Sequence, residues 1–121
     1  MLPISASPRS TMTIPVEGIF RALSDPTRLG VIERLSRGCA TVSELAAPYG
    51  MALSSFTEHL RLLEKCGLVR SRKEGRVRTY EIVPEGLQVA EDWLGRQRRL
   101  WEKRLDQLDE YLLSIKEEDT E

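Results

Sequence analysis

Positively charged side chains gather in one short stretch of this sequence. Residues 54–81 hold seven arginines and lysines against four glutamates, whereas the 121-residue chain has 18 basic and 19 acidic residues and a net charge of −1. Four of the seven cations surround Gly75, namely Arg72, Lys73, Arg76 and Arg78. Long cations at the tip of a turn contact the backbone phosphates of nucleic acid or enter a narrow minor groove. The stretch predicts such a contact, with a plain solvated charge run as the alternative.

Side chains suited to catalysis or metal binding are few. His59 is the single histidine, and Cys39 and Cys66 are the only cysteines. A nucleophile, a base and an orienting group do not occur as a set, and no glycine-rich phosphate-binding loop is present. Zinc and similar metals need three or four close ligands, which these residues do not supply. We therefore expect no enzyme activity, no catalytic residue, no metal ligand and no cofactor.

The two cysteines also bear on the cellular compartment. They cannot form a disulfide framework, which favours a reducing, intracellular environment. Cys66 is expected to be a buried thiol, and a redox switch at Cys66 or Cys39 is the alternative. The sequence has neither a signal-peptide pattern nor an apolar run long enough to span a membrane, so we expect a cytoplasmic protein.

Three short helices are predicted ahead of the cations. Pro15 begins a helix with one apolar stripe, and Asp25 with Pro26 forms the capped start of a second helix. Thr41 precedes Glu44 by three positions, which is the spacing of a capping box and predicts a third helix. A turn rich in proline and glycine separates it from the next helix, as is typical of a helix-turn-helix motif.

The fourth helix carries the other candidate contacts. Ser54 or Ser55 is expected to cap it, and its inward stripe consists of Phe56, Leu60 and Leu63. Its polar side chains lie away from this stripe: Ser54, Ser55, Thr57, Glu58, His59 and Arg61. They are candidates for contacts to base edges or phosphates, and the alternative is a solvated helix face. For His59 a further alternative is packing against a neighbouring helix.

Two strands and a long helix follow. Residues 68–83 form a pattern of two strands about a turn at Gly75, and Pro84 begins a helix that extends to about Ile115. Apolar residues recur along that helix every seven positions, in two series offset by four. One small domain cannot cover a stripe of this length, so we expect a homodimer. The expected interface residues are Ile19, Leu23, Leu94, Trp101, Leu105, Leu108 and Leu112.

The predicted fold class is mainly α with a small β-hairpin wing: a winged helix-turn-helix with a long C-terminal dimerisation helix. Residues 1–14 are expected to be a flexible leader, with Met12 as an alternative start, and residues 15–83 to form the DNA-binding domain. Residues 84–115 form the expected dimerisation helix, and residues 116–121 an acidic tail.

Four stretches of the sequence carry a family resemblance. They are residues 20–28 (Phe-Arg-Ala-Leu-Ser-Asp-Pro-Thr-Arg), 42–46 (Val-Ser-Glu-Leu-Ala), 58–69 and 74–76 (Glu-Gly-Arg). In this order they resemble the ArsR/SmtB family of dimeric winged-helix regulators, and the likeness extends over residues 15–113. It implies binding to duplex DNA through the fourth helix and the hairpin. The tract at 92–106 resembles a subgroup often encoded beside SRPBCC-fold proteins.

The sequence departs from the family pattern at two places. Metal-sensing members carry a Cys-x-Cys pair where Ala46 and Pro48 stand here, and the terminal helix contains no histidine, so the usual sensor sites are absent. A basic residue is common in the family where Glu58 stands. A carboxylate at this position either repels phosphate or accepts a hydrogen bond from cytosine N4 in the major groove.

The expected function is that of a DNA-binding transcriptional regulator. We expect a homodimeric repressor of its own operon that binds a near-palindromic operator in double-stranded DNA. The alternative is a winged-helix protein-interaction module without DNA binding, which the near-zero net charge and Glu58 suggest. A membrane partner is not expected, and the sequence does not identify a small-molecule effector.

Overall fold

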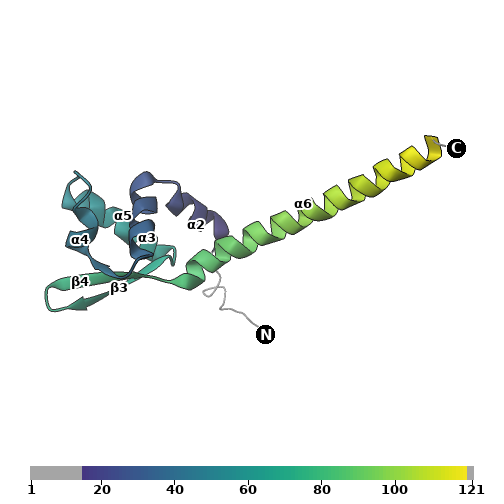
Figure 1. Cartoon of the computed structure of the whole chain (residues 1–121). Helices are drawn as coiled ribbons and strands as arrows, with labels where there is room; N and C mark the ends of the chain where they lie inside the picture. Colours follow the sequence, from purple (N-terminus) through teal and green to yellow (C-terminus); the bar gives the residue numbers. More distant parts are fainter. Residues whose placement is uncertain (1–14, 120–121) are drawn as a thin grey trace, which may run out of the picture. The chain divides into compact units, whose positions relative to one another are not determined.

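The computed structural model describes residues 15–119, so the expected leader and the last two residues lie outside the described part of the chain. The described elements are α2 (Val16–Leu23), α3 (Pro26–Leu35), β2 (Ala40–Thr41), α4 (Val42–Ala46), α5 (Leu53–Lys65), β3 (Val69–Glu74), β4 (Val77–Ile82) and α6 (Pro84–Asp119) (Figure 1). The chain divides into one compact unit that ends at Ala90 and a second that begins at Glu91. The predicted fold class, a winged helix-turn-helix with a long C-terminal helix, is confirmed.

An Asp-Pro corner joins α2 to α3. Asp25 is the N-cap of α3, and its carboxylate accepts a hydrogen bond from the backbone N–H of Arg28 at 3.0 Å. This hydrogen bond holds the pKa of Asp25 below its usual value. Pro26 occupies the first helical turn, where a missing N–H leaves no hydrogen bond unmade. The predicted start of this helix is confirmed.

The predicted capping box opens α4. The backbone N–H of Glu44 donates to the hydroxyl oxygen of Thr41 at 3.2 Å, and the Glu44 carboxylate accepts from the backbone N–H of Thr41 at 2.8 Å. The hydrogen bonds from Thr41 lower the pKa of Glu44. The two bonds satisfy donors that a helix start otherwise leaves unpaired.

Helix α5 begins earlier than the sequence predicts. Its first residue is Leu53 and its N-cap is Ala52, which offers no side-chain hydrogen bond, so the capping role expected of Ser54 or Ser55 is wrong. The hydroxyl of Thr57 donates back to the carbonyl of Leu53 at 2.8 Å. The predicted inward stripe is confirmed, since its three residues are fully buried: Phe56, Leu60 and Leu63.

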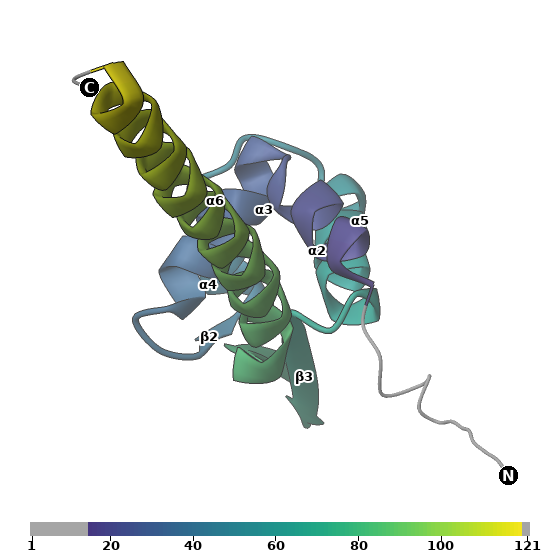
Figure 2. The ribbon, with the colours of Figure 1, turned by 90° about the vertical axis from the view of Figure 1, so that its right-hand side faces the viewer.

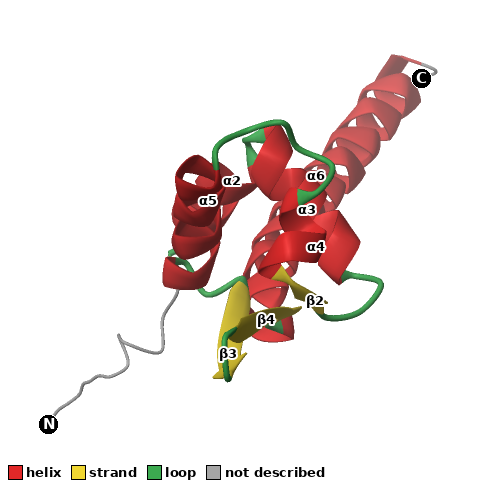
Figure 3. Cartoon of the chain, turned by 90° about the vertical axis from the view of Figure 1, so that its left-hand side faces the viewer, coloured by secondary structure: helices red, strands yellow, loops and turns green. Residues whose placement is uncertain are grey.

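The wing is a sheet of three strands in the order β2-β4-β3, at one end of the helices of the first unit (Figure 3). The predicted hairpin of β3 and β4 is present, and Gly75 in its turn has a φ of 63°, which favours glycine. Strand β2 was not predicted. It pairs with β4 through Ala40 opposite Tyr80 and Thr41 opposite Thr79, and two residues are too few to show an alternating pattern.

Apolar side chains from along the first unit meet in one core, around which α2, α3 and α5 are grouped (Figure 2). The largest fully buried side chains are Phe56, Ile19, Leu45, Leu60, Leu63, Leu68, Val31 and Val69. The first turns of α6 belong to this unit. A Cβ on Gly86 would lie 2.4 Å from the carbonyl oxygen of Gly67, so only glycine permits this close approach.

Helix α6 begins at Pro84 as predicted and ends at Asp119, beyond the expected end at Ile115. The first residues of the expected acidic tail, 116–119, are thus helical, because glutamate and lysine favour a helix. Along the second unit, large apolar side chains stay exposed. None of the helices in the described part of the chain has the length and apolarity needed to cross a membrane.

Candidate DNA-binding surface

Helix α5 presents a polar face opposite its buried stripe. The exposed residues on this face are Ser54, Ser55, Glu58, Arg61 and Lys65. Thr57 is half-buried, and its hydroxyl is engaged by the carbonyl of Leu53. Four of the six residues that the sequence predicts as contacts on this helix therefore lie on one accessible face, and a fifth, His59, lies at its edge. Thr57 is the least available for a contact.

An ion pair links Glu58 to Arg61 on the exposed face of α5. The carboxylate of Glu58 accepts from the guanidinium of Arg61 one turn later, and about two thirds of each side chain is exposed to solvent. Exposed ion pairs of this kind contribute little free energy, so an acceptor group on DNA can compete for Arg61. The acid that departs from the family pattern thus has a partner on its own helix.

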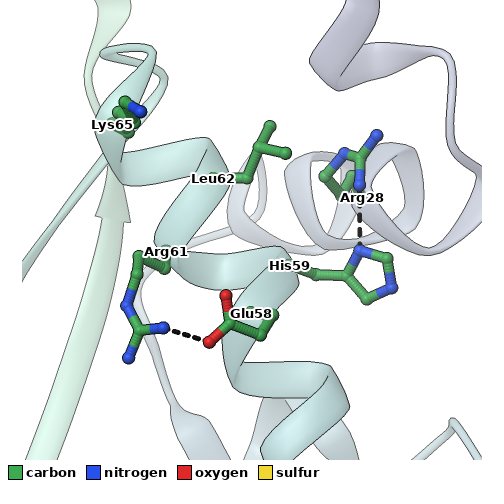
Figure 4. Close-up of a pocket in the computed structure, with 6 residues that line it drawn as sticks. All are labelled: Arg28, Glu58, His59, Arg61, Leu62 and Lys65. Atoms are coloured by element: carbon green, nitrogen blue, oxygen red, sulfur yellow. Dashed lines mark hydrogen bonds and ion pairs between the residues drawn. The ribbon is translucent and has the colours of Figure 1, made fainter.

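His59 lies at the edge of the same face and contacts α3. Its Nδ1 atom lies 3.0 Å from Nη1 of Arg28 (Figure 4). The carboxylate of Asp25 lies 3.8 Å from the same nitrogen. Arg28 was not among the residues predicted from the sequence. The Asp-Pro-Thr-Arg segment contained it, but only the packing of α3 against α5 shows that it reaches His59.

The wing holds both engaged and free cations. Arg70 pairs with Glu81, and this contact lowers the pKa of Glu81. Arg72 lies 3.7 Å from both Glu81 and Glu74. Lys73 and Arg76, which flank the turn, form no ion pair with any residue that the structure describes, and both are exposed.

A chain of polar contacts joins the wing to α5. Ser71 on β3 donates to the carboxylate of Glu64 on α5 at 3.1 Å, and Arg78 on β4 donates to the Ser71 hydroxyl at 2.8 Å. Of the predicted wing residues, Arg78 is therefore linked to α5 through Ser71 and Glu64. Sequence reasoning missed Ser71 and Glu64, because neither residue stands out by type or by spacing.

The cysteines show no sign of a reactive site. Cys66 is half-buried and its thiol donates to the carbonyl of Leu63 at 3.4 Å, while burial raises the pKa of the thiol. A raised pKa disfavours the reactive thiolate. Cys39 is exposed. Among the described residues, no three cysteine, histidine, aspartate or glutamate side chains lie together as a metal would need, and the absence of a metal stays a prediction.

The expected interface residues differ in their exposure. Ile19 is fully buried in the core of its own chain, so it offers no surface to a second subunit, which corrects its assignment. Leu23 is half-buried. The others lie on α6 with half or more of each side chain exposed: Leu94, Trp101, Leu105, Leu108 and Leu112.

Comparison with known proteins identifies this architecture. A model of a helix-turn-helix domain matches residues 23–72. The crystal structure of the ArsR family transcriptional regulator RHA00566 superposes with a TM-score of 0.70 at 55% sequence identity, over 72% of this chain and 90% of that one. The chain belongs to the ArsR family of DNA-binding, winged helix-turn-helix transcriptional regulators.

Two curated regulators are also similar. The HTH-type transcriptional regulator Rv2034 of Mycobacterium tuberculosis is 37% identical over 68 residues, which are 56% of this chain. The match spans 64% of Rv2034, less than two thirds of its length. The transcriptional repressor SdpR of Bacillus subtilis is 25% identical over 79 residues, which cover 65% of this chain and 88% of SdpR.

Proposed function

We propose that the protein is a homodimeric repressor that binds a near-palindromic operator and controls its own operon. The observation that carries this proposal is the polar face of α5, to which a hydrogen bond between Ser71 and Glu64 ties the wing. At its tip the wing carries two exposed cations, Lys73 and Arg76, that form no ion pair within the described residues. A helix of this kind enters the major groove, and flanking cations contact phosphates. We assign the protein to the cytoplasm, with no catalytic activity.

The dimer is supported by the second unit. Its apolar stripe is exposed in one chain, and burying each large side chain contributes about 1.5–3 kcal/mol before association costs. Its charges are also segregated: residues 96–104 hold five basic residues and one acid, and residues 105–118 hold five acids and one lysine. Two such helices in opposite directions bring each basic segment beside an acidic one.

Repression is supported by the similarity to SdpR, which is named a transcriptional repressor. Two subunits place their recognition helices about 34–36 Å apart, one turn of DNA, so the operator is expected to be near-palindromic. A protein bound to such a site in a promoter blocks the access of RNA polymerase.

The test is binding of the purified chain to the DNA upstream of its own gene. Fluorescence anisotropy with this duplex and with an unrelated one, at several salt concentrations, is expected to give tighter binding to the first and a steep loss of affinity with salt for both. Absence of salt-dependent binding to either duplex would contradict the proposal and favour a protein-interaction module.

A further inference from the structure

The guanidinium of Arg28 fixes the protonation pattern of the His59 ring. Its Nε donates to the carbonyl of Ala22 at 2.8 Å and its Nη2 to the carbonyl of Arg21 at 3.4 Å, which leaves Nη1 facing Nδ1 of His59 at 3.0 Å (Figure 4). A guanidinium has N–H donors and no acceptor. Nδ1 therefore accepts, and the neutral ring carries its proton on Nε2.

The acid beside the ring does not change this assignment. Asp25 lies 3.8 Å from Nδ1, beyond hydrogen-bond distance, and its carboxylate already accepts from the backbone N–H of Arg28. Within residues 15–118, no group forms a hydrogen bond with Nε2 of His59. Arg28 thus engages the ring at Nδ1, and the Nε2–H remains available to a further acceptor, with 23% of the side chain exposed.

We propose that Arg28 is a positioning residue for His59, and that the Nε2–H of His59 donates to a phosphate of the DNA backbone. This inference rests on the proposed DNA binding. His59 borders a depression of about 400 Å³ that is also lined by the cationic side chains of Arg61 and Lys65. Its single acid, Glu58, is paired with Arg61. With Glu58 paired, the remaining charges around the depression are positive and favour an anionic partner such as a phosphate.

The place of His59 on α5 favours a phosphate over a base. When a helix lies in the major groove, residues at the centre of its exposed face meet base edges, and residues at its border meet the sugar-phosphate backbone. His59 is at the border, where α5 contacts α3. A neutral N–H bound to phosphate adds affinity without reading sequence, and it releases no counterion because it carries no charge.

Two substitutions test the roles of Nε2 and Nδ1 of the ring separately. His59→Gln places an amide near the position of Nε2, and His59→Asn places one near the position of Nδ1. We expect His59→Gln to bind duplex DNA within about twofold of the wild type. His59→Asn is expected to lose about fivefold to tenfold, on operator and unrelated duplexes alike, with an unchanged salt dependence. Equal binding by wild type and His59→Asn, or weaker binding by His59→Gln than by His59→Asn, would overturn the phosphate contact.

The role of Arg28 has its own spectroscopic test. Because His59 is the single histidine, long-range ¹H–¹⁵N spectra of the full chain report one imidazole. We expect the Nε2–H tautomer in the wild type at neutral pH and a mixture of tautomers in Arg28→Lys, whose one ammonium group cannot reach three acceptors. An Nδ1–H ring in the wild type, or the same tautomer in both proteins, would overturn the positioning role. If the wild type binds no duplex, the proposed function fails, whereas the tautomer still tests the contact between Arg28 and His59.

Discussion

Ser71 on the first wing strand donates to the carboxylate of Glu64 on α5 across 3.1 Å. The same hydroxyl accepts from Arg78 on the second strand, so three elements meet at one side chain. The wing therefore has a defined position relative to α5, the proposed recognition helix. Arg78 is thus engaged within the chain, and the hairpin cations without an ion-pair or hydrogen-bond partner in the described residues are Lys73 and Arg76 at the tip.

The first prediction concerns that tip. Replacing both Lys73 and Arg76 with alanine is expected to weaken binding to every duplex alike, because phosphate contacts position a protein without specifying sequence. The slope of log affinity against log salt is expected to fall by about two, since each lost phosphate contact accounts for about 0.9. Anisotropy titrations between about 50 and 200 mM salt measure both quantities.

Arg70→Ala is the matched control, because it removes a cation of the same hairpin that already pairs with Glu81. It is expected to change the slope much less than the double variant does. A double variant with the wild-type slope, or one that reorders the preference among sequences, would contradict the assignment of the tip to phosphates.

The second prediction concerns sequence preference. Arg61→Ala is expected to change the ranking of operator variants by about 1–3 kcal/mol at the base pair where the contact is lost. Glu58→Gln is expected to tighten binding to all duplexes at low salt, because it removes a charge that repels phosphate and competes for Arg61. Competition titrations with single-base operator variants measure the ranking. An unchanged ranking in Arg61→Ala would place sequence recognition elsewhere.

Much of the fold that positions this surface was predictable from the sequence, because its signals are local. The capping box at Thr41, the glycine at the wing turn and the buried stripe of α5 each depend on residues within a few positions of one another. Strand β2 and the contact between Arg28 and His59 depend on segments far apart in the chain. Such pairings follow from the tertiary packing of strands and helices, which a single sequence does not show.

The third prediction concerns the pH dependence of stability. Hydrogen bonds from Thr41 lower the pKa of Glu44 in the folded chain, so this carboxylate stabilises the fold above the pKa it has in the unfolded chain. That stabilisation is lost as the pH falls through the lower, folded pKa. Glu44→Gln is therefore expected to reduce the free energy of unfolding near pH 7, by an amount that shrinks below about pH 4.

Urea unfolding of the wild type and the variant across this range of pH measures the difference. Glu33→Gln, at an exposed glutamate on α3 outside the capping box, is the control and is expected to leave the pH dependence unchanged. A difference between Glu44→Gln and the wild type that stays constant down to about pH 3 would contradict the capping role of the carboxylate.

The same contrast between local and distant signals explains the interface residues. A seven-residue repeat identified the apolar stripe of α6, and its members from Leu94 onward are exposed in one chain, whereas Leu87 packs on the core. The helix of Ile19 also has an apolar stripe, but a stripe does not tell whether its own core or a second subunit covers it. Ile19 is buried in its own core.

The fourth prediction concerns assembly. Replacing both Leu105 and Leu108 with glutamate is expected to yield monomers, because each charge would have to be buried in the proposed apolar interface. Leu113→Glu is the control: the residue is 60% exposed on the same helix, against 52% for Leu105 and 50% for Leu108, but lies off the stripe, so this variant is expected to remain a dimer. Sedimentation at several concentrations measures the mass. A dimeric Leu105→Glu/Leu108→Glu variant would contradict the proposed interface.

The most direct test of the central claim is the mass of the complex between the wild-type chain and the palindrome upstream of its gene, measured by analytical ultracentrifugation at physiological salt. Two chains on one duplex are predicted, with much weaker binding when either half of the palindrome is scrambled, because each half-site receives one recognition helix. A single chain bound as tightly to one half-site as to the whole palindrome would contradict the account of a dimer that reads DNA through two copies of α5.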